Sequence, residues 1–176
     1  MEQSVKSTAL NYGLYLGLFF TAATAIIYAV SLDLFIEWWL GIIFFVIAIV
    51  VGVMAATKSK KLLGGFISFK NAFTAFFVTL ALGSLIGTIV TIIIFAFVDP
   101  EAAQYLNEQI LILTKQTMER FGAPDDTIRE ALAKAEDKDN FSLASQMIGW
   151  VWRLLIYIIF GLIVALIVKK NDPEKA

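Results

Sequence analysis

The sequence contains no cysteine and no histidine. Their absence excludes disulfides, thiol nucleophiles and imidazole bases, and it removes the usual ligands of zinc, haem and iron–sulfur clusters. Charged residues make up 16% of the chain, whereas soluble domains contain about 25%. The formal net charge is −1, which leaves no basic surface to neutralise the phosphates of a nucleic acid. We therefore expect no cofactor and no nucleic-acid partner.

Hydrophobic residues, by contrast, make up 59% of the chain and gather in long runs. Four runs are almost purely apolar: 10–30, 38–56, 71–98 and 147–168. A helix needs about 20 residues to cross a hydrocarbon core of about 30 Å, and these runs meet that length. The strands of a membrane β-barrel would be about half as long and would alternate in polarity. The sequence predicts an all-α integral membrane protein with four transmembrane helices in a single domain, 1–176, embedded in a lipid bilayer.

The first run also contains Ala23-Thr24-Ala25, which fits the small-residue cleavage pattern of a signal peptide. However, the following residues, 26–30, stay apolar, and the segment before the run carries little net positive charge. We expect an uncleaved first helix.

Lysine positions predict the orientation in the membrane. Lysines lie in the N-terminal tail, the second loop and the C-terminal tail: Lys6; Lys58, Lys60, Lys61 and Lys70; Lys169, Lys170 and Lys175. The first loop, 31–37, contains two acids and no basic residue. By the positive-inside rule both termini and the second loop are cytoplasmic, and 31–37 and 99–142 face outward. The four tryptophans lie at the predicted outer ends of spans two and four, where indole is favoured: Trp38, Trp39, Trp150 and Trp152.

The polar insert 99–142 separates spans three and four. Apolar residues recur near helical spacing in its first half: Leu106, Ile110, Leu113, Met118 and Phe121. Gly122 fits the end of a helix, and Pro124 followed by Asp125 and Asp126 fits the start of another. Ser142 can cap the fourth span. The pattern predicts an amphipathic helical hairpin on the outer membrane surface.

Acidic residues cluster in the second half of this insert: Asp125, Asp126, Glu136, Asp137 and Asp139. Carboxylate clusters can bind calcium or magnesium. Because calcium-loop spacing is missing and lysines alternate with the acids, solvated helix ends are favoured over a metal site. We predict no catalytic, cofactor-binding or metal-binding residue.

Arg153 is the one charged residue within the four predicted spans. An arginine near the end of a span can extend its charged group to the membrane surface. Alternatively, it forms an ion pair with Asp99, at the outer end of span three, or with Asp33 or Glu37. A third interpretation gives Arg153 a role in binding, because ionisable residues inside membranes commonly have functions.

Glycines at a spacing of four residues lie in spans one and three: Gly13 and Gly17, and Gly83 and Gly87. This spacing allows helix backbones to approach closely within a membrane. The glycines would pack helices within one four-helix bundle or form the contact of a homodimer.

The predicted cytoplasmic segment 65–73 reads Gly-Phe-Ile-Ser-Phe-Lys-Asn-Ala-Phe. Gly64-Gly65 can break the preceding helix, and Ser68 can cap the next one. This segment suggests a sequence family. Together with Asp99-Pro100 after the third span and Lys169-Lys170 after the fourth, it resembles the bacterial membrane proteins catalogued as domain of unknown function 4199. The resemblance implies a bacterial inner-membrane location. It implies no activity and no catalytic residue, because the family has none assigned.

These observations favour a non-enzymatic scaffold, accessory subunit or envelope-interaction module that uses its outward insert. The alternative is a component of a small-solute or lipid transporter or channel, and a continuous polar cavity that reaches Arg153 would distinguish it. A membrane enzyme would additionally need the acids of the insert to converge on that arginine.

Overall fold

The computed structural model describes residues 2–171, apart from the side chain of Glu2; the predicted basic residue Lys175 lies outside this range. The elements, in chain order, are α1 (Glu2–Val30), η1 (Leu32–Ile36), α2 (Trp38–Leu62), α3 (Phe69–Ile92), η2 (Ile93–Val98), α4 (Pro100–Arg120), α5 (Asp125–Glu136) and α6 (Leu143–Val168). Element η1 is a 3₁₀ turn and η2 a π-helical continuation of α3. The chain has four helices long and apolar enough to span a membrane, as predicted.

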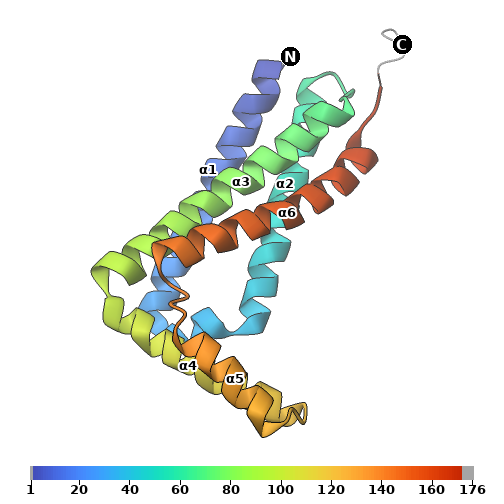
Figure 1. The fold of residues 1–176 in the computed structure, drawn as a ribbon. Helices are drawn as coiled ribbons and strands as arrows, with labels where there is room; N and C mark the ends of the chain where they lie inside the picture. Colours follow the sequence, from blue (N-terminus) through green and yellow to red (C-terminus); the bar gives the residue numbers. More distant parts are fainter. Residues whose placement is uncertain (1, 172–176) are drawn as a thin grey trace.

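Helix α3 is the centre of the bundle, since it packs against α1, α2 and α6 (Figure 1). Helices α1 and α3 run side by side over most of their length. Helices α4 and α5 lie together at the end of the molecule opposite the N-terminus. The structure therefore separates a long apolar bundle from a short polar pair of helices.

The first helix begins earlier than the predicted run 10–30 does, because its polar start is also packed. Val5 and Ala9 are almost completely buried. The hydroxyl of Thr79 on α3 donates a hydrogen bond of 3.1 Å to the carbonyl of Ala9. The predicted N-terminal tail is thus the first part of α1.

The glycines that were predicted to mediate helix packing lie where α1 meets α3. A Cβ atom added to Gly17 would lie 2.5 Å from Ile86 Cδ1, and one added to Gly83 would lie 2.7 Å from Leu16 Cδ2. Gly13 and Gly87 face α3 and α1 in the same way, and an added Cβ would come within 3.0 Å of a side chain across the contact. The four glycines are therefore covered by packing inside one chain.

The lysine-rich end of the bundle is closed by contacts between α2, α6 and the α2–α3 loop. Ile67 and Lys170 exchange two backbone hydrogen bonds, of 2.9 and 3.0 Å. The Lys60 ammonium donates to the carbonyl of Val168 at 2.9 Å. These bonds hold the last turn of α6 near α2, whereas towards α4 and α5 the two helices separate (Figure 1).

A second apolar cluster lies at the opposite end of the bundle. Phe95, Leu106 and Phe141 are buried there and bring together η2, α4 and the start of α6. The ring of Phe35 in η1 packs edge-on against Phe95 at 5.0 Å between centroids. This cluster holds η1 against α4, directly before the first turn of α2.

Candidate functional site

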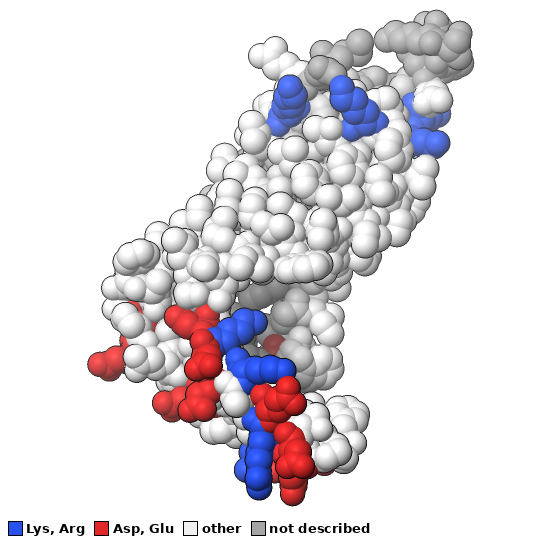
Figure 2. Space-filling view, in the orientation of Figure 1, with Lys and Arg blue, Asp and Glu red and all other residues white. Residues whose placement is uncertain are grey.

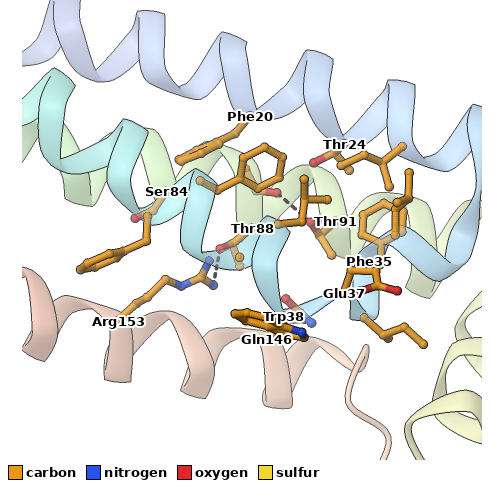
Figure 3. A pocket seen from close by; sticks show the side chains of 18 of the residues that line it. Phe20, Thr24, Phe35, Glu37, Trp38, Ser84, Thr88, Thr91, Gln146 and Arg153 are labelled. Atoms are coloured by element: carbon orange, nitrogen blue, oxygen red, sulfur yellow. Dashed lines mark hydrogen bonds between the residues drawn. The ribbon is translucent and has the colours of Figure 1, made fainter. Parts of the chain in front are cut away.

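A cavity of about 520 Å³ lies between α1, α2, α3 and α6, on the α4–α5 side of the bundle (Figure 3). Element η1 and the first turn of α2 border it at the end nearest α4. Cavities of this size are typical of sites for small organic molecules. Since its walls come from all four membrane helices, the cavity lies within the membrane-spanning part of the protein.

Each long helix contributes one face to the cavity. From α3 come Ser84, Thr88 and Thr91, separated by four and three residues. From α6 come Gln146, Arg153 and Tyr157, separated by seven and four residues. These spacings place side chains on one side of a helix. The result is a line of hydroxyl groups on α3 opposite a guanidinium and an amide on α6.

Aromatic rings form much of the remaining wall. Phe20 and Phe44 meet edge-on at 5.9 Å between centroids, and Phe45 stacks on Tyr157 at 6.3 Å. The indole N–H of Trp150 donates to the Ser84 hydroxyl at 3.1 Å. The cavity thus combines an extensive apolar wall with a few polar groups at defined positions, as ligand sites commonly do.

Arg153 is the positive charge of this cavity. It lies ten residues into α6, about 15 Å from the beginning of the helix at 1.5 Å per residue. Its guanidinium points towards α3 and donates a 3.4 Å hydrogen bond to the Thr88 hydroxyl (Figure 3). Thr88 is neutral, and within the described part of the chain no carboxylate forms an ion pair with Arg153.

The acids considered as partners of Arg153 have other neighbours. The Asp99 carboxylate accepts hydrogen bonds from the Tyr28 hydroxyl at 2.6 Å and from the Ala102 N–H at 3.0 Å. Asp33 accepts a 2.8 Å hydrogen bond from the Tyr105 hydroxyl. The predicted pair of Arg153 and Asp99 is therefore replaced by contacts of Asp99 to α1 and to its own helix.

These tyrosine contacts join the α4 region to α1 and η1. They also shift the pKa values of Asp99 and Tyr105. The Tyr28 hydroxyl, followed by the Ala102 N–H, lowers the pKa of Asp99 below its ordinary value. Hydrogen bonding to Asp33 raises the pKa of Tyr105 above its ordinary value. At neutral pH Asp99 is therefore ionised and Tyr105 protonated, the forms that accept and donate these hydrogen bonds.

Glu37 is the remaining acid and lies on the wall of the same cavity as Arg153. It precedes α2, and its side chain makes no capping hydrogen bond there. Figure 3 shows Glu37 and Arg153 towards opposite ends of the drawn cavity. The site therefore holds one carboxylate and one guanidinium, which are not paired with each other.

The hydroxyl residues of α3 were not singled out from the sequence. Their signal is the recurrence of Ser84, Thr88 and Thr91 on one helical face within an otherwise apolar run. Serine and threonine often bond to the carbonyl four residues earlier, as Thr91 does to Gly87 at 3.1 Å, so the pattern alone does not indicate a site. The pattern indicates a site only because Arg153 faces these hydroxyl groups across the cavity.

The acidic residues of the α4–α5 region lie away from this cavity. Asp125 and Asp126 occupy the first turn of α5, and Asp139 accepts a hydrogen bond from the Asn107 side chain at 3.0 Å. Within residues 2–171 no three acidic side chains converge to hold a metal ion.

Comparison with known proteins agrees with the sequence resemblance. The family model described as "Protein of unknown function (DUF4199)" matches residues 11–170. No curated protein and no solved structure matches the chain. The match extends from the first membrane helix to the last and includes every residue of the cavity. The chain therefore belongs to the DUF4199 family.

Proposed function

We propose that this protein binds an amphiphilic molecule with an anionic group in its intramembrane cavity, without converting it chemically, as a lipid- or solute-handling component of the bacterial inner membrane. The observation that carries the proposal is the Arg153 guanidinium on the cavity wall, which forms no ion pair within residues 2–171. A charge inside a membrane is costly unless it is paired or solvated. An anionic group bound between Arg153 and Thr88 would supply the missing charge, and the aromatic wall would cover an apolar portion.

The proposed orientation has both termini in the cytoplasm and the cavity in the outer half of the membrane. Seven lysines lie near the ends of α1 and α6 and around the α2–α3 loop, and within residues 2–171 Glu2 is the one acid in these segments. Segments 31–37 and 99–142 carry twelve acids and five basic residues. Figure 2 shows these two charged regions at opposite ends, separated by an uncharged band on the visible face. The excess of lysine at one end supports the assignment of that end to the cytoplasm.

A second function, as a scaffold or accessory subunit, is favoured by the exposed apolar residues of the α4–α5 region. Leu106 is buried in the outer cluster, but further along the same helix Leu113 is 41% exposed, and Phe121, next to the turn, is 84% exposed. In this proposal α4 and α5 form an amphipathic hairpin outside the membrane. Its exposed apolar residues would contact another envelope protein or the lipid surface.

The binding proposal can be tested with the full-length protein in a neutral detergent. An equimolar mixture of phosphatidylethanolamine and phosphatidylglycerol is added, and total bound phospholipid is measured by native mass spectrometry. We expect Arg153→Gln to reduce total binding about tenfold, since a hydrogen bond to a charged group contributes about 1.5–3 kcal/mol. Arg153→Lys keeps the charge and should reduce binding less.

Arg129→Gln is the matched control, because this exposed arginine on α5 lies outside the cavity. It should bind lipid as the wild type does. In a parallel arm inorganic phosphate is added; phosphate that displaces the lipid at millimolar concentration would indicate a soluble anion as the ligand. Equal lipid binding by the wild type and Arg153→Gln would overturn the cavity proposal and leave the scaffold function as the better one.

A further inference from the structure

We infer that the amphiphile is a zwitterionic phospholipid, whose phosphate is bound by Arg153 and whose ammonium group is bound by Glu37. This inference rests on the proposed function and deepens it. It follows from the presence of two opposite charges at separate places in one cavity, since a ligand with a single anionic group would leave the Glu37 carboxylate without an ionic partner within residues 2–171.

The two charged side chains are available to a ligand. They form no ion pair with each other or with another described residue, and both side chains are exposed. Their formal charges cancel, so the site as a whole matches a molecule of zero net charge. A lipid with only a negative head group would be attracted by Arg153 but repelled by Glu37.

The order of the charges along the membrane normal matches the order in such a lipid. Glu37 directly precedes the first residue of α2, at the outer end of the cavity. Arg153 lies ten residues into α6 and is hydrogen-bonded to Thr88, which lies ten residues before the end of η2, the continuation of α3. In phosphatidylethanolamine the phosphate is closer to the acyl chains than the ammonium group is. Binding with the ammonium outward therefore directs the chains into the bundle.

The apolar wall distinguishes a lipid from a wholly hydrophilic zwitterion such as phosphoethanolamine. Phe20, Phe44 and Phe45 line the cavity beside the charged groups. Phosphoethanolamine has the same two charged groups but no apolar part to cover these rings. The cavity, at about 520 Å³, accommodates a head group and the beginning of the chains.

The lipid mixture described above tests this inference through the ratio of the two bound lipids. The wild type should bind more phosphatidylethanolamine than phosphatidylglycerol. Glu37→Gln keeps the shape of the side chain and removes its charge, so it should lower phosphatidylethanolamine binding about fivefold and leave phosphatidylglycerol binding equal or higher. Asp126→Asn removes an exposed carboxylate outside the cavity and should leave the ratio unchanged. Free phosphoethanolamine, added in a separate arm, should not displace the lipid.

The outcomes separate this inference from the proposed function. If Arg153→Gln loses lipid but Glu37→Gln keeps the wild-type ratio, the cavity binds amphiphiles and the zwitterionic inference is wrong. Preferential binding of phosphatidylglycerol by the wild type would also overturn it, as would displacement by phosphoethanolamine. If Arg153→Gln binds as much total lipid as the wild type, the proposed function itself fails.

Discussion

At the scale of single residues, the contact between Tyr28 and Asp99 predicts a pH dependence of stability. The folded state lowers the pKa of Asp99, chiefly through the Tyr28 hydroxyl. The contribution of this carboxylate to stability is therefore fully present above its unfolded pKa of about 3.9 and is lost as the pH falls through the lower folded value. We expect Tyr28→Phe to lower the melting temperature at pH 6. The further fall in melting temperature between pH 6 and pH 3 should be smaller in this variant than in the wild type. Circular dichroism in detergent across this range measures both effects.

Tyr15→Phe is a suitable control for this experiment. Tyr15 is on the same helix, is 65% exposed, and its hydroxyl makes no hydrogen bond within the described chain. Its removal should leave the acid profile unchanged. Parallel profiles for the wild type and Tyr28→Phe would show that the hydroxyl does not stabilise the ionised form of Asp99.

The partners of individual charged residues could not be predicted from the sequence, and Asp99 shows why. Its position after span three made Arg153 a plausible neighbour. In the structure the last turns before it are π-helical, and the Asp99 N–H bonds to the carbonyl of Ile94, five residues earlier, at 2.7 Å. These wider turns change the direction in which the following residue points. Hydrophobicity does not report such a local change of helix type.

At the scale of helices, the close contact of α1 with α3 predicts that one methyl group added at Gly83 lowers the stability of the protein. An added Cβ at Gly83 would lie within 2.7–2.8 Å of three atoms of Leu16, a side chain that is 1% exposed. We expect Gly83→Ala to destabilise the protein by about 1–3 kcal/mol, the usual cost of overpacking a filled interface. Thermal or denaturant unfolding in detergent measures it.

Gly149→Ala on α6 is the matched control, because nothing lies within 4 Å of its added Cβ. It makes the same chemical change in a helix and should be neutral or gain up to about 1 kcal/mol from the higher helix propensity of alanine. Equal stability of the two variants would mean that α1 and α3 do not approach each other as closely as described.

Helix ends were more predictable than helix contacts, because end signals are local. Ser68 and Ser142 were expected to cap the third and fourth spans, and each accepts a 3.3 Å hydrogen bond from the N–H three residues later. Gly122 has a φ of +72° after α4, the conformation that a helix-ending glycine adopts. The start of α1 was missed because it depends on burial of Val5 against other helices, which a polar neighbouring sequence conceals.

At the scale of the whole molecule, the two ends of the bundle differ in a way that suits a binding site in one membrane leaflet. The end with Lys60 and Lys170 is held closed by hydrogen bonds between α2, α6 and their neighbouring loop. The other end contains the cavity, with Arg153 and Glu37 on its walls. The sequence predicted the four spans that build this shape. The sequence did not predict the cavity, because predicting a cavity requires knowing how the four helices pack and which of their faces line it.

The leaflet that supplies the ligand depends on orientation, which predicts the outcome of reporter fusions. A reporter after residue 176, or inserted at Gly64 in the α2–α3 loop, should be active only as a cytoplasmic reporter. One inserted at Gly122, in the exposed turn between α4 and α5, should be active only outside. Insertion at this turn leaves the buried cluster around Leu106 intact, so folding should be retained. The opposite pattern at Gly64 and Gly122 would place the cavity in the cytoplasmic leaflet and refute the proposed orientation.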